Sequence, residues 1–406
     1  MNFQKGLLDK GSGALTLLLA LLTAVGPLST DMYLPSLPAI GTALDGTTSM
    51  VQLTLSVFIA GFAFGQIFYG PLSDRYGRKP VLIVGLIGYL AGSIACALAQ
   101  HIEALIIARF FQALGASAAI VLARAVVRDL FEGDKAARLL SLMGALMGVV
   151  PLIAPVLGAV LEVKFGWRAS FALTSVISAI LLIACLLFLP ETLPTDRQRR
   201  WSFSGMIFDF SSLLRHLVFL RYTASFCLAY GGLFVLISTS SFVFQNHFAL
   251  SELQFGFAFS VCVAGYITGT LIGARVSGKY DIEALTYLGS MLLGGSGLVM
   301  IVLSFASEQQ VWHLLLPLFV SMMGVGFVMP QSMAGGLTPF PQMAGTASSL
   351  MGFLQNIIAA LFGIAGAWFI DFEPNALAWI VGITGLINFA ISIAYRRFVS
   401  KQQPLA

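Results

Sequence analysis

Two charged residues stand inside long apolar stretches of the chain, where charge is rare. Asp31 lies in the stretch from about Ala14 to Ile40 and is the one acid among 18 that falls well inside such a run. Arg109 opens the segment Arg-Phe-Phe-Gln of a later run. Burial favours the neutral form of a carboxyl group, whereas a nearby guanidinium favours its charged form. A carboxyl group under both influences can bind and release a proton, so we predict that Asp31 and Arg109 handle a coupling proton.

Both residues also have simpler interpretations. Asp31 could cap a helix break made by Pro35 and Pro38, and Arg109 could be an interfacial arginine whose side chain reaches toward water. The two residues lie at similar depths from the outer ends of their predicted helices. We therefore expect them to approach each other, and whether they pair directly stays open.

The composition indicates which elements position these residues. Hydrophobic residues make up 58% of the 406, charged residues only 10%, and the mean hydropathy is +0.91. A soluble domain carries about 25% charged residues. In a bilayer only helices or closed barrels satisfy the backbone, and barrel strands alternate apolar and polar residues, whereas this chain has continuous apolar runs.

We therefore predict an all-α membrane protein with twelve transmembrane helices in two six-helix bundles, since each span needs about 20 residues. The predicted spans cover residues 14–40, 48–71, 80–99, 103–127, 136–162, 168–189, 217–245, 252–274, 284–305, 312–335, 343–369 and 375–395.

The lysines and arginines orient these helices. If the N-terminus is cytoplasmic, 19 of the 22 basic residues lie on or near the inner side, the exceptions being Arg109, Lys164 and Arg168. Cytoplasmic loops carry such an excess, so both termini are predicted to be cytoplasmic in a multi-pass protein of the bacterial inner membrane. The net charge of +4 reflects this bias and predicts no nucleic-acid partner.

The polar segment from Pro190 to about Arg215 predicts a cytoplasmic linker between two halves. The predicted domains are an N-terminal six-helix bundle (1–189), the linker (190–215) and a C-terminal six-helix bundle (216–406). The tetrapeptide Ser-Leu-Met-Gly occurs at 141–144 and again at 349–352, in the predicted fifth and eleventh helices. This faint repeat is typical of two-lobed transporters built from parallel halves.

The loop after the second predicted helix carries a cluster of charge. Residues 70–80 read Gly-Pro-Leu-Ser-Asp-Arg-Tyr-Gly-Arg-Lys-Pro, in which Gly70 and Gly77 permit a tight turn. Asp74 could accept hydrogen bonds from a helix N-terminus or from Arg75 and Arg78. The cluster could latch one conformation, or it could serve only as a basic loop that fixes orientation.

Bend-prone and small residues recur near one face of the predicted fifth helix, which favours a flexible, tightly packed helix. They are Gly144, Gly148 and Pro151 or Pro155, and the same helix also carries Ala154 and Gly158. The alternative is a proline-kinked packing helix without directional meaning.

These segments resemble motifs of the major facilitator superfamily. The 70–80 loop is similar to its G-x-L-a-D-r-x-G-r-k signature, which implies stabilisation of the outward-open state. The segment 109–117 resembles the R-x-x-Q-G motif of antiporters, with Ala113 in place of glycine, and implies proton transfer near Arg109. Residues 154–158 resemble the antiporter motif found in exporters, with Ala154 in place of its first glycine.

Two further phrases, Ser-Thr-Asp-Met-Tyr-Leu-Pro-Ser-Leu-Pro at 29–38 and Met-Ala-Gly-Thr-Ala-Ser-Ser-Leu at 343–350, resemble the Bcr/CflA drug-resistance branch, which includes bicyclomycin and phenicol exporters. The resemblance runs over the whole chain. Some relatives carry a second acid earlier in the first helix, where this chain has Thr23, Ala24 and Pro27.

A polyspecific substrate cavity needs adaptable apolar and aromatic walls. Such side chains could equally face lipid or the core. The predicted substrate-binding residues are Asp31, Pro27, Leu28, Phe58, Phe62, Gln112, Met143, Met147, Tyr230 and Phe234.

The leading prediction is a proton-coupled antiporter that exports small, mostly apolar drugs or metabolites by alternating access. The alternative is a proton-coupled uptake symporter for a small neutral metabolite, and a non-transporting membrane sensor is a third class. The sequence contains no G-x-x-x-x-G-K-[ST] loop of ATP-driven pumps. We expect no enzyme activity, no metal site and no cofactor beyond the proton. The expected partners are a small-molecule substrate and the lipid bilayer, and the protein is expected to be a monomer.

Overall fold

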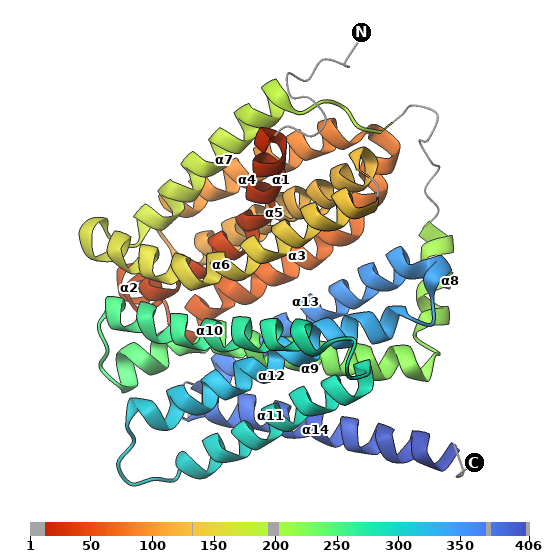
Figure 1. The fold of residues 1–406 in the computed structure, drawn as a ribbon. Helices are drawn as coiled ribbons and strands as arrows, with labels where there is room; N and C mark the ends of the chain where they lie inside the picture. Colours follow the sequence, from red (N-terminus) through yellow and green to blue (C-terminus); the bar gives the residue numbers. More distant parts are fainter. Residues whose placement is uncertain (1–12, 132, 194–202, 371–374, 403–406) are drawn as a thin grey trace. The chain divides into compact units, whose positions relative to one another are not determined.

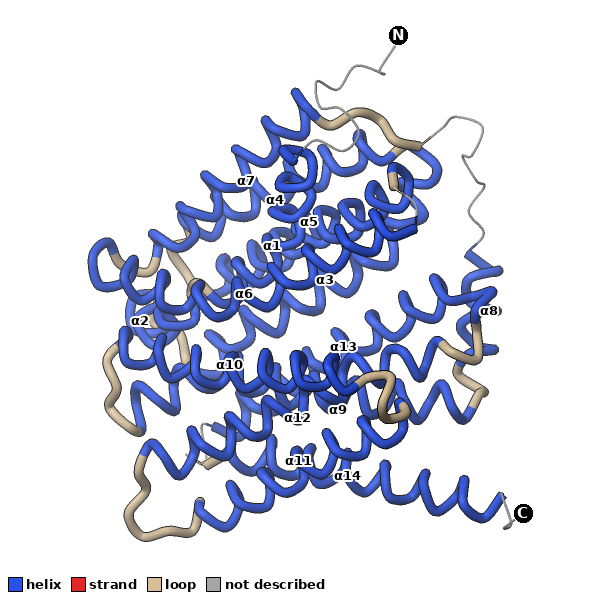
Figure 2. Tube along the Cα trace, viewed as in Figure 1, coloured by secondary structure: helices blue, strands red, loops and turns tan. Residues whose placement is uncertain are grey.

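The described part of the chain folds into helices joined by loops, and Figure 2 shows no strand there. The structure is a computed structural model that describes residues 13–131, 133–193, 203–370 and 375–402. Twelve helices in these ranges are long and apolar enough to cross a membrane. Each overlaps one of the twelve predicted spans, so the predicted all-helical membrane fold is confirmed.

The helices group into two compact units, Met1–Ser202 and Phe203–Ala406. In the first unit α5 packs against α1, α3 and α4, while α6 packs against α1. The elements of this unit are α1 (Gly13–Asp31), η1 (Leu34–Ser36), α2 (Leu37–Ala43), α3 (Thr48–Tyr76), α4 (Arg78–Leu98), α5 (Ile102–Leu130), α6 (Gly133–Phe165) and α7 (Arg168–Phe188) (Figure 1).

Glycine allows the close helix contacts around α5. A Cβ atom on Gly115 would overlap the backbone of Tyr89 in α4. A Cβ atom on Gly61 of α3 would lie 2.7 Å from the carbonyl oxygen of Phe110. Small residues at such crossings let helix backbones approach where lipid supplies no hydrophobic drive between helices. The resulting tight α3–α4–α5 core holds Arg109 in place.

In the second unit α9 packs against α12, α13 and α14, and α11 packs against α12 and α14. The elements are α8 (Phe203–Leu213), α9 (Leu217–Phe242), the π-helical turn η3 (Val243–His247), α10 (Glu252–Val276), α11 (Ile282–Leu303), α12 (Val311–Leu337), η4 (Pro341–Met343), α13 (Ala344–Ile370) and α14 (Ala376–Gln402).

The predicted linker region contains the short helix α8. Its Leu213 is buried in a cluster with Phe219 and Met351, whereas Phe208 is 74% exposed. This division of apolar side chains between core and surface is the pattern of a helix that lies along one face of its unit.

Candidate functional site

The first membrane-spanning segment is broken immediately after Asp31. Helix α1 ends at this residue, and the chain continues through η1 and α2, which carry Pro35 and Pro38 near their starts. A proline has no backbone N–H to donate, so a continuous helix is interrupted here. The Asp31 carboxyl group is buried at the break, and its Oδ1 accepts a hydrogen bond of 2.9 Å from Thr30 Oγ1. A buried carboxylate without a cation is costly, and proton binding would relieve that cost.

Arg109 contacts helix α1, which ends at Asp31, by a hydrogen bond to the backbone. Its Nη1 donates to the carbonyl oxygen of Ser29 (3.0 Å) and to Oε1 of Gln112 (2.7 Å). Among the described residues, no ion pair joins Arg109 to Asp31 or to any other carboxylate. The open question of direct pairing is thus answered in this conformation: the guanidinium binds a carbonyl two residues before the acid.

Aromatic rings surround the Arg109 guanidinium, which is fully buried. Its Cζ lies 4.1 Å from the centroid of the Phe58 ring and 4.5 Å from that of the Tyr33 ring. Such contacts contribute about 2 kcal/mol when the cation is desolvated. Within the part of the chain that the structure describes, Nε and Nη2 have no hydrogen-bond partner. Arg109 is therefore a cation buried in the protein core and not an interfacial arginine that reaches water. Two of its nitrogens remain available to donate further hydrogen bonds.

A hydrogen-bonded network extends from Arg109 into α4. Gln112 Nε2 donates to Ser93 Oγ (2.9 Å), and the Ser93 hydroxyl donates to the carbonyl oxygen of Tyr89 (2.7 Å). The Tyr89 hydroxyl lies 2.6 Å from Ser29 Oγ, which returns the network to α1. The roles of Ser29, Ser93 and Tyr89 in this network could not be predicted from the sequence, because single serines and tyrosines in apolar runs are too common to stand out.

Helix α6 meets the break in α1 at Gly158. A Cβ atom at this position would overlap the carbonyl oxygen of Met32, the residue after Asp31. The Ser170 hydroxyl of α7 donates to the same oxygen (3.4 Å). At Gly144 and Gly148, by contrast, an added Cβ would meet nothing within 4 Å. The tight packing of this helix on a neighbour is therefore seen at Gly158, and the structure shows no such contact at Gly144 or Gly148.

Replacing Gly158 with alanine is therefore expected to impair transport strongly, because the backbone at Met32 must move to admit a methyl group. The matched control is Gly148→Ala, which adds the same methyl group to open space on the same helix. Initial transport rates in membrane vesicles, normalised to the amount of inserted protein, compare the two. Equal rates for the two variants would contradict the importance of this contact.

The predicted loop at 70–80 is mostly helical, because α3 continues to Tyr76 and α4 begins at Arg78, so that only Gly77 lies between the two helices. In this 70–80 segment an ionic cluster surrounds Arg78. Its Nη1 donates to Asp74 Oδ1 and its Nε donates to Asp129 Oδ2 of α5 at 2.8 Å. Gly77 has φ +97°, a left-handed backbone that favours glycine. Arg75 lies over the Tyr76 ring at 5.1 Å, and a Cβ atom on Gly70 would meet nothing within 4 Å. Asp74 was expected to accept hydrogen bonds from a helix N-terminus or from an arginine, and the structure shows the arginine Arg78 as its partner.

The predicted substrate residues lie in four places. Around Arg109 lie Phe58 and Gln112, and the Phe62 ring stacks on Phe58 with centroids 6.4 Å apart. The other predicted residues are Pro27 and Leu28, half-buried on α1; Met143, buried, and Met147, half-buried, on α6; and Tyr230, half-buried, and Phe234, buried, on α9 of the second unit.

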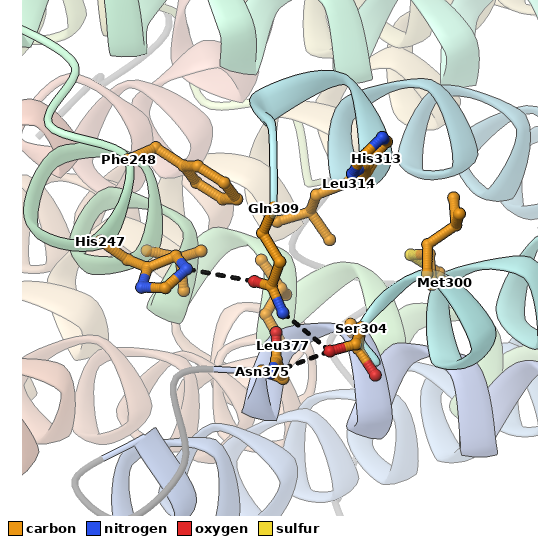
Figure 3. Close-up of a pocket in the computed structure, with 12 residues that line it drawn as sticks. His247, Phe248, Met300, Ser304, Gln309, His313, Leu314, Asn375 and Leu377 are labelled. Carbon is orange, nitrogen blue, oxygen red and sulfur yellow. Dashed lines mark hydrogen bonds between the residues drawn. The ribbon is translucent and has the colours of Figure 1, made fainter. Parts of the chain in front are cut away.

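A hollow of about 350 Å³, part of it open to solvent, lies in the second unit where η3 meets α11, α12 and α14 (Figure 3). The His247 ring and Gln309 Oε1 are 3.1 Å apart, and Gln309 Nε2 donates to the carbonyl oxygen of Ser304 at 2.7 Å. Asn375 Nδ2 donates to the same carbonyl at 3.4 Å. These residues could not be recognised as a group from the sequence, because His247 and Asn375 are each more than 50 residues from Ser304 and Gln309 in the chain.

Comparison with known proteins agrees with this architecture. The sequence model of the Major Facilitator Superfamily matches residues 19–364. The chain belongs to this superfamily. Its members are transporters and not enzymes, as predicted. The chain is 31% identical to the chloramphenicol resistance protein of Pseudomonas aeruginosa over 368 residues, which cover 90% of this chain and 86% of that protein.

The predicted resemblance to bacterial drug-resistance proteins is confirmed by a second relative. The chain is 29% identical to the bicyclomycin resistance protein homolog of Haemophilus influenzae over 357 residues, which cover 87% of this chain and 89% of the relative. Among solved structures, the human organic anion transporter MFSD10 matches with a TM-score of 0.69 at 19% identity, covering 93% of this chain and 98% of that one. At this identity the match shows the fold alone.

Proposed function

We propose that this superfamily member is a proton-coupled antiporter that exports small, mostly apolar drugs or metabolites by alternating access. The observation that carries the proposal is the buried Asp31 carboxyl group at a helix break, two residues after the carbonyl that Arg109 binds. Protonation there changes the charge beside the guanidinium network, and the break gives the backbone a place to respond. Asp31 and Arg109 are the proposed coupling residues.

The proton gradient is large enough for this task. One proton that moves inward releases about 2.3 kcal/mol per 100 mV of membrane potential and about 1.4 kcal/mol per pH unit. A combined release of about 4 kcal/mol supports roughly a thousandfold gradient of a neutral drug.

The direction and the substrate class are inferred from two features. The relatives named above are resistance proteins toward chloramphenicol and bicyclomycin, and Gly158 of the exporter-type motif contacts the break beside Asp31. The scarcity of charge in the spans favours neutral or weakly charged substrates. We propose that Pro27, Leu28, Phe58, Phe62, Gln112, Met143, Met147, Tyr230 and Phe234 contribute to the substrate path.

Expression in a bacterial host that lacks its own efflux pumps tests the proposal. Resistance to at least one neutral antibiotic, with chloramphenicol and bicyclomycin tried first, is expected to rise several-fold with the wild-type protein and not with Asp31→Asn. If no compound in a broad panel is affected although the protein is inserted in the membrane, export of drugs is the wrong function and uptake becomes the leading alternative.

We further propose that the protein works as a monomer in the bacterial inner membrane with both termini in the cytoplasm. A green fluorescent protein fused after residue 406 is expected to fluoresce, and alkaline phosphatase fused there is expected to be inactive. Alkaline phosphatase inserted at His101, between α4 and α5, should be active. The reverse pattern at these two sites would overturn the orientation that the positive charges predict.

A further inference from the structure

The carboxylate of Glu191 accepts hydrogen bonds from four backbone N–H groups. Two of them are at the start of α4 and two are in the residues that follow Glu191. Its Oε1 accepts hydrogen bonds from the backbone of Arg78, Thr192 and Leu193, each at 2.9 Å. Its Oε2 accepts from the backbone of Lys79 at 3.1 Å. Glu191 follows α7, whereas Arg78 and Lys79 begin α4, 113 and 112 residues away in the chain. The first N–H groups of a helix have no partner within it, and a negative charge there is stabilised by the helix dipole.

Gly77 makes room for this carboxylate. A Cβ atom at position 77 would lie 2.6 Å from Glu191 Oε2, closer than non-bonded atoms approach. The same residue has φ +97°. The turn before α4 favours glycine here because of its positive φ, and the missing side chain also leaves space for the Glu191 carboxylate.

The residue after Glu191 extends the contact to α5. The Thr192 hydroxyl donates to Asp129 Oδ2 at 3.1 Å, and the same oxygen accepts from Arg78 Nε at 2.8 Å. Lys79 Nζ in turn donates to the carbonyl oxygen of Leu186 near the end of α7, at 3.0 Å. Glu191 thus binds the backbone N–H of Arg78, and Thr192 binds the Asp129 carboxylate that the Arg78 side chain also contacts.

We propose that Glu191 is a positioning residue for the junction of α3 and α4 at Gly77. It fastens the start of α4 to the end of α7 and so directs the Arg78 guanidinium between Asp74 and Asp129. Release of this contact alters the rate of conformational exchange in the transporter. Glu191 itself contacts neither the substrate nor the coupling proton. The inference rests on the proposed function only in that the protein transports by changing conformation.

Glu191→Ala removes all four acceptor contacts, whereas Glu191→Gln keeps one oxygen but loses the charge and turns an N–H group toward Lys79. In proteoliposomes, the maximal rate of downhill substrate flux is expected to fall about tenfold in Glu191→Ala, equivalent to about 1.4 kcal/mol, and less in Glu191→Gln. The KM for substrate should stay near its wild-type value. Hydrogen exchange at the amides of Arg78 and Lys79 should become faster in Glu191→Ala. Glu308→Gln, an exposed acid in the loop after α11, is the matched control.

Downhill flux needs conformational exchange but no imposed proton gradient, so its rate can be measured whether or not protons move in exchange, and the test separates this inference from the proposed antiport. If the wild type carries substrate downhill without moving protons, the antiport proposal fails and the Glu191 comparison stands. A Glu191→Ala rate equal to that of Glu308→Gln would overturn the positioning role. A rise in KM that accounts for the whole loss of flux would also overturn it, because it would place Glu191 in substrate binding.

Discussion

Replacing Asp31 with asparagine is expected to abolish uphill export while the protein still folds and inserts. The amide has nearly the shape of the carboxyl group and can still accept the hydrogen bond from Thr30, but it cannot carry a proton across the cycle. In inside-out membrane vesicles, drug accumulation driven by an imposed proton gradient should fall to the level of vesicles without the protein. Downhill drug exchange, which needs no proton coupling, should persist.

The matched control for this prediction is Asp45→Asn. Asp45 is exposed beyond the end of α2 and has φ +49°, a conformation that asparagine also adopts readily. Replacing Asp45 makes the same chemical change and alters the net charge by the same amount. We expect Asp45→Asn to retain full proton-coupled transport. Retention of proton-driven accumulation in Asp31→Asn would move the coupling site elsewhere in the chain.

Replacing Arg109 with alanine should also eliminate export, and lysine should not rescue it. The planar guanidinium binds the Ser29 carbonyl and Gln112 while it lies against the rings of Phe58 and Tyr33. The lysine ammonium is a compact point charge, so it cannot bind the Ser29 carbonyl and Gln112 and also lie flat against the two aromatic rings. We expect a loss of at least about a hundredfold in transport rate for both variants, equivalent to about 2.7 kcal/mol.

Initial rates of proton-driven drug uptake, together with thermal unfolding of the purified variants, check this prediction. Arg275→Lys is the control, since Arg275 is exposed near the end of α10. Near-normal transport by Arg109→Lys would show that charge alone suffices and that the aromatic and carbonyl contacts are dispensable.

The helices could be predicted from the sequence because a bilayer demands about 20 apolar residues in each span. The break at the end of α1 was also foreseeable, since Pro35 and Pro38 lack the N–H groups that a helix needs. In this sense the simpler interpretation of Asp31, a residue at a proline-induced break, is compatible with the functional one. The structure places the carboxyl group at that break and also buries it.

Contacts between side chains on different helices could not be predicted. The depth of Asp31 and Arg109 suggested proximity, but the rotation of α5 about its axis determines that Arg109 reaches the Ser29 carbonyl instead of the carboxyl group. Glu191 could be assigned only to a charged linker, because its partners at the start of α4 lie more than a hundred residues earlier. Sequence periodicity likewise grouped Gly144 and Gly148 on one face of the predicted fifth helix, whereas the glycine of this helix that meets a neighbouring backbone is Gly158.

The most direct test of the account measures proton movement during substrate efflux. Proteoliposomes that contain the purified protein and a luminal pH indicator are loaded with a drug that the resistance panel has identified, and are then diluted into drug-free buffer. Outward drug movement through an antiporter brings protons in, so the lumen should acidify with the wild-type protein and should not change with Asp31→Asn. A lumen that becomes more alkaline, or that stays unchanged while the wild type releases drug, would contradict proton-coupled antiport.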